Sequence, residues 1–428
     1  MSAKYKANQK NVLINIGPRH LFLTTTFYYL WALKDEYNLY VIADNDYVNF
    51  DEANSFLSEF AVRIFYKPQR NSFKNHFRLK QIIKEAVFSS NLDICLTHNT
   101  NYLDGQYLKH FIFQINKDKF FFEIQTGKLP VKYSEWQSDF KARLTSMASS
   151  LAGPNASIFS FKAKLFFLKI SNLIRYFINF KFYPLIIIRK VFNPHINIYN
   201  GMVKPSNKNT TKVLCYINKE RDFYKNHLFY TTFLIKHPIS EFGKNALKYF
   251  YDSKVDLNSN IIFIAPSYGF TDIMRSKGMQ PKSIINNISL KWIQSIDKLK
   301  LAFKDYDINI KLHPASCNDF IWNEIVKIIK HEFPEVKILD PLDNAEMYVL
   351  RSEVIVSDVS AVPWCASFYD DKIVVSLDIF DYEGGDTFKN YSDQINYINN
   401  IDNIISLSST NKRINNNLSI GDFLKEYL

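Results

Sequence analysis

The stretch that decides the fold lies between residues 308 and 377. Its short apolar runs are INIKLHP (308–314), VKILDP (336–341), EVIVSD (353–358) and KIVVSL (372–377). They are rich in β-branched residues, and the helical stretch NDFIWNEIVKIIKHEF (318–333) separates the first two. Buried strands that alternate with helices are typical of a parallel sheet covered by helices on its faces. This part of the chain is therefore predicted to form an open α/β domain.

The same alternation occurs nearer the N-terminus. Further strands are predicted at NVLINIG (11–17), LYVIAD (39–44), LDICLTH (92–98), KFFFEIQTG (119–127), TKVLCYI (211–217) and NIIFIAPS (260–267), with a helix at 21–34. A chain of 428 residues is too long for one core. We therefore expect two Rossmann-like domains, residues 1–200 and 201–428, joined near the polar, turn-rich segment 195–210.

Composition excludes several classes of protein. Hydrophobic residues make up 47% and charged residues 22%, while Gly (11) and Pro (14) are few, so disordered and collagen-like chains are excluded. The four cysteines lie far apart without metal-ligand spacing, which suits a reducing cytosol. The first residues are too weakly apolar for a signal peptide, and no run approaches the roughly 18 apolar residues of a membrane-spanning helix.

The positive charge is concentrated in one window. The formal net charge is +11, and residues 140–219 contain thirteen Lys or Arg but no Asp or Glu, so the rest of the chain is close to −2 (11 − 13). Within this window, segment 157–192 has basic residues at helical spacing among Phe and Leu. Such a helix suits an anionic membrane surface. An ordinary solvated helix pair is the alternative, and nucleic acid is not expected as a partner because no recognition motif is present.

Polar residues follow three predicted strands, where open parallel sheets bind ligands. His313 follows one strand, Ser357, Asp358 and Ser360 follow another, and Ser267 follows a third. A histidine can donate a hydrogen bond or a proton to a leaving phosphate, and hydroxyls can donate to phosphate oxygens. A helix beginning after Ser360 would add backbone N–H groups. Asp358 is expected either at the phosphate or holding backbone N–H groups of the turn.

The order of these motifs resembles the C-terminal half of the CDP-glycerol glycerophosphotransferase family, the teichoic-acid-type polymerases. The motifs that match are Lys311-Leu312-His313-Pro314, DNAEMYVLRSEVIVSDVSA (343–361) and Ala265-Pro266-Ser267. The resemblance covers about residues 255–380. It implies a GT-B architecture, two Rossmann-like domains facing a central cleft, with a cytidine or uridine diphospho-donor held by the second domain. It further implies that no cofactor or metal is required.

The first domain departs from that family. The family has a histidine-containing motif in this domain, and the resemblance implies that this His is the catalytic base. This chain has Thr126 at the corresponding place in IQTGKLP (124–130). Threonine is no base near neutral pH. Glu123 or His98, which is expected to face the cleft, is predicted to replace it. Glu123 also resembles the carboxylate of bacterial sialyltransferases and Kdo transferases. Further cleft residues are expected at Arg19, His20 and Gly127.

Together these observations predict an inverting GT-B transferase. It would move a polyol phosphate or sugar from a cytidine-nucleotide donor to a lipid-linked or polysaccharide acceptor, as a cytoplasmic protein peripheral to the inner face of the membrane. Glu123, His98 and His313 are the predicted catalytic residues. The alternatives are a glycosyltransferase using CMP-sialic acid or CMP-Kdo, a UDP-sugar epimerase, and a non-catalytic capsule-assembly protein.

Overall fold

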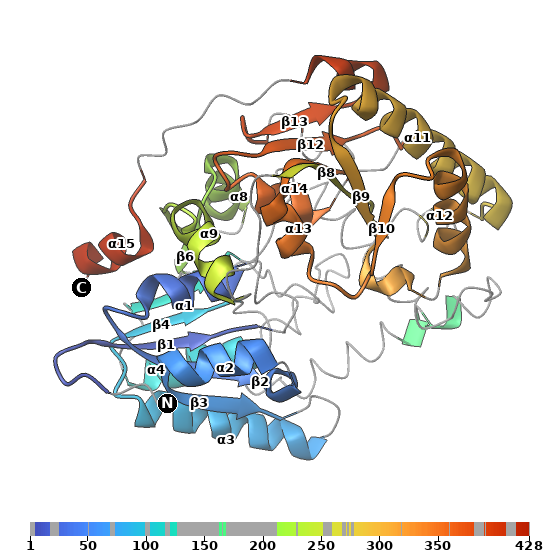
Figure 1. Ribbon diagram of the computed structural model, residues 1–428. Helices are drawn as coiled ribbons and strands as arrows, with labels where there is room; N and C mark the ends of the chain where they lie inside the picture. Colours follow the sequence, from blue (N-terminus) through green and yellow to red (C-terminus); the bar gives the residue numbers. More distant parts are fainter. Residues whose placement is uncertain are drawn as a thin grey trace. The chain divides into compact units, whose positions relative to one another are not determined.

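The computed structural model describes the two sheets and most of their helices (Figure 1). The described residues are 5–17, 25–49, 51–68, 73–98, 103–115, 120–125, 162–164, 166–167, 212–227, 230–250, 259–267, 271, 274, 278–317, 319–358, 360–380, 389, 391–407 and 417–427. They form two compact units, each built around its own parallel sheet.

The first unit contains a seven-stranded sheet. Its strands, in spatial order, are β3 (Ala61–Lys67), β2 (Asn38–Asp44), β1 (Asn11–Asn15), β4 (Ile94–Thr97), β5 (Phe121–Ile124), β6 (Lys212–Cys215) and β7 (Thr231–Leu234). Every neighbouring pair is parallel. The central strands β1 and β4 are buried along their whole length, which explains why their sequences are continuous apolar runs. The strand order reverses between β1 and β4.

Helices cover this sheet. They are α1 (Phe27–Leu33), α2 (Asp51–Phe60), α3 (Phe73–Ser89), α4 (Leu103–Gln114), α8 (Asn218–His227), α9 (Pro238–Phe250) and α15 (Ile420–Tyr427). Helix α9 shows why: Ile239, Ala246, Leu247 and Phe250 recur at helical spacing and are buried, while the intervening residues are mostly exposed. Helix α15 packs on strands β5 and β7 through aromatic contacts, among them those of Tyr427 with Phe122 and Phe233.

The division of the chain differs from the predicted boundary at residue 200. Strands β6 and β7 belong to the first sheet, where Phe122 pairs with Lys212, and helix α15 also belongs to the first unit. Sequence order alone assigned 211–217 to the second domain, because the long basic window separates it from β5. The pairing of β6 with β5 depends on contacts between segments that are distant in the sequence, so it could not be predicted from sequence order.

The second unit contains a six-stranded parallel sheet. Its order is β10 (Lys337–Leu339), β9 (Asp307–Lys311), β8 (Ser259–Ala265), β11 (Ser352–Ser357), β12 (Ile373–Leu377) and β13 (Ile395–Ile398). The helices are α11 (Pro281–Ala302), α12 (Phe320–Glu332), α13 (Ala345–Arg351) and α14 (Ala361–Ala366). Helix α11 buries Ile284, Ile288 and Trp292 against the sheet, and the carboxylate of Asp319 caps α12 by accepting from the Ile321 N–H at 2.9 Å.

All strands predicted from the sequence are present, and three others were missed. Strand β3 alternates between buried and exposed residues, and β7 and β13 are only four residues long, so none of them is a continuous apolar run. Of the predicted basic segment 157–192, the structure describes only residues 162–164 and 166–167, which are helical. In the described part of the chain, helices long and apolar enough to cross a bilayer are absent.

Candidate functional site

The second sheet reverses its strand order between β8 and β11, and the predicted polar residues gather at that reversal. Ala265, the last residue of β8, lies opposite Ser357, the last residue of β11. Just beyond the strands, the backbone N–H of Ser267 donates to Oδ1 of Asp358 at 2.8 Å. Open α/β sheets bind ligands outside the carboxyl ends of their strands at such a reversal. The residues that the sequence predicted for a binding edge therefore do lie together at the carboxyl ends of β8 and β11.

Two of the residues at this edge are buried and bonded within the protein. Ser357 donates to the carbonyl of Ala265 and lies 2.7 Å from the hydroxyl of Ser360, and both Ser357 and Asp358 have no exposed surface. Burial raises the pKa of Asp358 well above the usual range of a carboxyl, although the Ser267 N–H opposes this. Asp358 therefore holds a backbone N–H, as the second of its two predicted roles requires, but this N–H belongs to Ser267 after β8 rather than to its own turn.

In contrast to the buried Ser357 and Asp358, Ser360 and Ser267 are partly exposed. The hydroxyl of Ser360 caps α14 by accepting from the Val362 N–H at 3.2 Å, so the helix begins where the sequence predicted. Helix α14 has only six residues, so its dipole is short and adds little to anion binding. The hydroxyl of Ser360 itself is thus the stronger candidate contact for a phosphate.

His313 lies at the same edge of the sheet, on the far side of β8. Ile264 of β8 pairs with Ile310 of β9, so β9 and β11 flank β8 and end together, about 10 Å apart by ordinary strand spacing. The side chain of His313 is exposed, and its carbonyl accepts from both the N–H (2.9 Å) and the hydroxyl (2.6 Å) of Ser316. A tight turn therefore presents the imidazole on the edge that carries Ser360.

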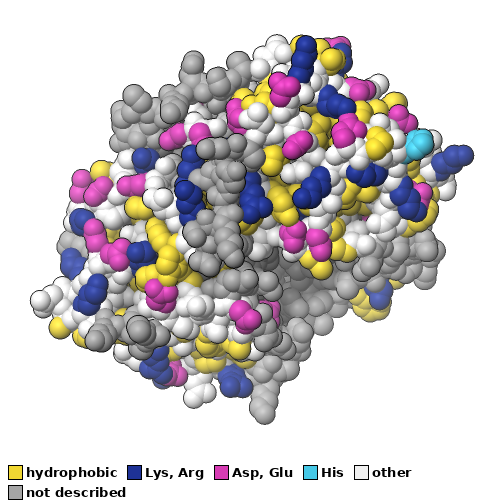
Figure 2. Space-filling model, in the orientation of Figure 1, with side chains coloured by type: hydrophobic (Ala, Val, Ile, Leu, Met, Phe, Trp, Pro, Cys, Tyr) yellow, Lys and Arg dark blue, Asp and Glu magenta, His cyan; other side chains and the backbone are white. Residues whose placement is uncertain are grey.

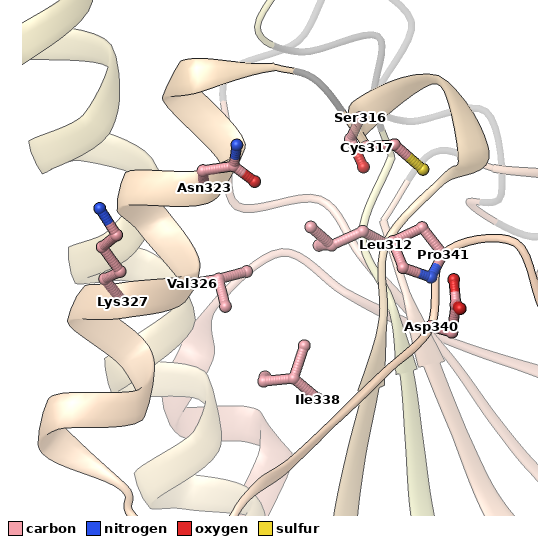
Figure 3. Close-up of a pocket in the computed structure, with 9 residues that line it drawn as sticks. All are labelled: Leu312, Ser316, Cys317, Asn323, Val326, Lys327, Ile338, Asp340 and Pro341. Carbon is pink, nitrogen blue, oxygen red and sulfur yellow. The ribbon is translucent and has the colours of Figure 1, made fainter.

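A cavity of about 550 Å³ adjoins the His313 turn (Figure 3). It lies between α12 and the strands β9 and β10, and its lining is Leu312, Ser316, Cys317, Asn323, Val326, Lys327, Ile338, Asp340 and Pro341. Leu312 and Ser316, on either side of His313 in the chain, both line it. Its walls combine apolar side chains with a few polar groups, as small-molecule sites commonly do.

Lys311, known from the sequence only as part of the Lys311–Pro314 motif, is the buried last residue of β9 and has a structural role. Its ammonium donates to the carbonyl of Pro341 at 2.8 Å, which ties the end of β9 to the loop after β10. Burial lowers its pKa, while Glu346 and nearby aspartates act in the opposite direction. Lys311 therefore fixes one wall of the cavity.

In the first unit, His98 lies at the point where the strand order reverses, between β1 and β4. This residue follows β4, and its side chain is buried rather than open to a cleft as predicted, with 1% of its surface exposed. Its backbone N–H and its Nδ1 both lie 3.2 Å from the carbonyl oxygen of Asn15. The ring also packs against Gly17, since a Cβ at that position would lie 2.7 Å from the ring carbon Cδ2.

These contacts define the state of the imidazole. A backbone carbonyl only accepts, so Nδ1 carries the proton and Nε2 holds the lone pair of the neutral ring. Burial lowers the pKa of His98 to about 4, with Asp104 opposing and Lys67 reinforcing that effect. His98 is consequently neutral at physiological pH, with Nε2 able to accept a hydrogen bond.

Glu123, the other predicted base, is the third residue of β5 and is buried, with 5% of its surface exposed. It pairs with Thr97 and Val213 on the neighbouring strands. Burial lowers the pKa of Lys109, and the negative charge of Glu123 opposes this shift. Burial raises the pKa of Tyr224, and Glu123 adds to this shift. Glu123 therefore interacts with groups on the helices α4 and α8, one residue short of the end of its strand.

The other predicted cleft residues, Arg19, His20 and Gly127, and the substituted position Thr126, lie outside the described residues. In the described part of the chain, groups of three or more His, Cys, Asp or Glu placed to hold a metal ion are not found.

The structure also brings together, at the carboxyl edge of the first sheet, polar residues that the sequence did not predict. Lys67 ends β3, Asn15 ends β1, and Asp104 lies in the first turn of α4, and all three are buried together. For Asn15 the available signal was a polar residue at the last position of an apolar strand, whereas Lys67 ends an alternating strand and Asp104 lies on a helix. His237 follows β7 and is also buried, with its Nδ1 accepting from the Ile239 N–H at 3.1 Å.

The chain is similar to solved structures of known proteins. A UDP-N-acetylglucosamine 2-epimerase has a TM-score of 0.50 at 11% identity, with 95% of this chain and 86% of that chain covered. The UDP-GlcNAc 2-epimerase from Methanocaldococcus jannaschii has a TM-score of 0.48 at 12% identity (95% and 94% covered), and a sialyltransferase from Photobacterium damsela 0.41 at 14% (91% and 81%). No protein-family model and no curated protein matches the sequence. The predicted GT-B fold, two parallel-sheet α/β units, is confirmed.

Proposed function

We propose that this protein is a GT-B transferase that takes a sugar or polyol phosphate from a nucleotide-activated donor, with cytidine as the expected base. The observation that carries the proposal is the edge of the second sheet, where His313, Ser360 and Ser267 are accessible and Asp358 and Ser357 are buried beneath them. An edge with accessible donors on a rigid, internally bonded support suits a nucleotide phosphate.

In this proposal the roles of the residues are divided. His313 and the hydroxyl of Ser360 donate to the departing nucleotide phosphate as the bond between donor group and phosphate breaks. Ser357 and Asp358 hold the turn and touch no substrate. The nucleoside occupies the cavity beside the His313 turn, where Leu312 and Pro341 offer apolar surface and Asn323 and Asp340 offer polar atoms.

The acceptor hydroxyl loses its proton as its oxygen forms the new bond, at phosphorus for a polyol phosphate or at the anomeric carbon for a sugar. Of the two predicted bases, His98 presents a neutral imidazole whose lone pair is on Nε2, the form a base requires. Glu123 is the alternative base. No metal or cofactor takes part in the proposed reaction.

Binding of nucleotides tests the proposal. In a thermal-shift panel of CMP, CDP, UDP, CDP-glycerol, CDP-ribitol and CMP-sialate, the cytidine compounds should stabilise the wild type. A ligand at 100 times its Kd adds about 2.7 kcal/mol, which corresponds to roughly 5–10 °C for a unit of this size. His313→Ala should lose the response. His331→Ala, which removes an exposed imidazole from the last turn of α12, is the matched control and should retain it.

A UDP-sugar epimerase is the second candidate, because the structure shares its fold with a UDP-N-acetylglucosamine 2-epimerase over 95% of the chain. An epimerase would bind UDP in preference to cytidine nucleotides and would convert a UDP-sugar without any acceptor. Stabilisation by cytidine nucleotides alone would exclude it. Absence of a response to every nucleotide would favour a non-catalytic capsule-assembly protein instead.

We further propose that the enzyme works on a bacterial surface polymer at an anionic membrane face. The described residues of the basic segment support this, since Phe166 and Phe167 are 60% and 65% exposed beside the exposed Lys162 and Lys164. On the face shown in Figure 2, by contrast, basic and acidic side chains are interspersed. Aromatic rings and ammonium groups together suit a headgroup layer.

Vesicle co-sedimentation tests the membrane proposal. The wild type should bind vesicles of anionic phosphatidylglycerol and phosphatidylcholine but not of phosphatidylcholine alone. The double substitution Phe166→Ser and Phe167→Ser should weaken that binding. Leu342→Ser, which removes an equally exposed apolar side chain (72%) outside the segment, should not. Equal binding to both vesicle types would contradict the proposal.

A further inference from the structure

A buried lysine forms a hub at the carboxyl edge of the first sheet. Lys67, at the end of β3, has 2% of its surface exposed. Its ammonium lies 2.7 Å from Oδ2 of Asp104, 2.9 Å from Oδ1 of Asp44 and 3.2 Å from Oδ1 of Asn15. An ammonium group has three N–H donors, so all three are used. The hub joins the ends of β1, β2 and β3 to the start of α4.

Asn15 forms hydrogen bonds both with the hub and with His98. Its side-chain amide donates to the hydroxyl of Thr97 at 3.1 Å and approaches Asp104 at 3.4 Å, while its amide oxygen accepts from Lys67. The backbone carbonyl of the same residue accepts from Nδ1 of His98. Asn15 thus bonds the hub through its side chain and the imidazole of His98 through its backbone carbonyl.

We propose that Lys67 and Asp104 are positioning residues for His98: by anchoring Asn15, whose backbone carbonyl accepts from Nδ1, they hold its imidazole in the Nδ1–H form with Nε2 as the acceptor. This deepens the proposed function, on which it rests, by explaining how a buried histidine is kept ready to accept the proton of an acceptor hydroxyl. Neither residue touches substrate.

The charges around His98 make the proposal specific. Asp104 on α4 and Asp44 on β2 favour the imidazolium, whereas Lys67 on β3 and burial disfavour it. Removing the positive charge should therefore make the ring easier to protonate, and removing the charge of Asp104 should make it harder. A merely structural hub would behave differently, because loosening it from either side would let water reach the ring and make protonation easier in both cases.

Nitrogen-15 NMR of the histidine rings in the free, full-length protein is the test. In Lys67→Met the titration midpoint of His98 should rise above that of the wild type. In Asp104→Asn, which keeps an oxygen acceptor for Lys67, it should fall. Lys67→Arg retains the charge and should remain close to the wild type. Lys372→Met, which removes another buried ammonium bonded to the Leu350 carbonyl in the second unit, should leave His98 unchanged.

His237 is the internal control in every spectrum, because it is buried at the edge of the same sheet but bonds Ile239 rather than the hub. Shifts of His98 in opposite directions in the two variants, with His237 constant, would support the proposal. Shifts in the same direction, or none, would overturn it. If Lys67→Met does not fold, the fall in Asp104→Asn alone decides, since a structural role predicts a rise. These readouts need no donor or acceptor, so they succeed or fail separately from the proposed transferase activity.

Discussion

The contact between Gly17 and His98 leads to a quantitative prediction about a single methyl group. In Gly17→Ala the new Cβ would lie 2.7 Å from Cδ2, 2.9 Å from Cγ and 3.2 Å from Nε2 of the imidazole. Carbon atoms prefer to lie about 3.5–4.0 Å apart, so the two groups must separate by roughly 1 Å. The ring cannot easily move, because it is buried and its Nδ1 is bonded to Asn15.

The magnitude follows from the cost of overpacking. Forcing a methyl group into a packed site costs about 1–3 kcal/mol, and replacing glycine returns about 0.4–1 kcal/mol through the unfolded chain. The net loss of about 1–2 kcal/mol should lower the Tm of the first unit by roughly 2–8 °C, measured by calorimetry. Gly421→Ala is the matched control. Its Cβ would meet nothing closer than 3.9 Å and would lie in helix α15, so the Tm should be unchanged or slightly higher.

A double-mutant cycle assigns the effect to the imidazole. When His98 is replaced by alanine, the atoms that the new methyl group would meet are gone, so Gly17→Ala should then cost little. An equal loss of Tm in the His98→Ala background would refute the reasoning, because the strain would then arise elsewhere. No loss in the wild-type background would refute it as well.

Three further outcomes follow from the second unit and from the thiols of both units. The raised pKa of Asp358 means that its folded form holds the proton more tightly, so its stabilisation is complete below about pH 4 and is lost as the pH rises through the folded value. Asp358→Asn cannot ionise, so urea unfolding should show its advantage over the wild type growing from pH 4 to pH 8, and a constant difference would contradict this. Ser360→Ala removes the cap of α14 and should cost about 1 kcal/mol, read as a lower Tm, and an unchanged Tm would count against the cap. Of the four free thiols, only Cys317 is not buried, so it should react with Ellman's reagent in the folded protein while the others react only after unfolding; rapid reaction of several thiols would contradict the fold.

The sequence predicted the fold class well because its evidence is local. Runs such as EVIVSD and INIKLHP are apolar and β-branched, and the polar residues at or just after their strand ends, His313, Ser357, Asp358 and Ser360, lie at the carboxyl edge of a parallel sheet. The cap at Ser360 is equally local, because it depends on the residues of one turn. These features were therefore predictable from neighbouring residues alone.

What the sequence did not show depends on pairing between distant segments. The placement of β6 in the first sheet depends on the free edge of β5, and the burial of His98 depends on Gly17 and Asn15, more than eighty residues earlier. The Lys67 hub was missed for the same reason, since an end-of-strand lysine looks exposed until its three acceptors are brought together. Likewise, the buried support formed by Asp358 could not be separated by sequence from the accessible Ser360.

The central claim is that the edge of the second sheet holds the phosphates of a nucleotide donor. The most direct measurement is a crystal structure of the protein with CDP or UDP bound. The account predicts the diphosphate within hydrogen-bond distance of the Ser360 hydroxyl and the His313 imidazole, with Asp358 still bonded to the Ser267 N–H. A nucleotide bound with its phosphates remote from both His313 and Ser360 would contradict it.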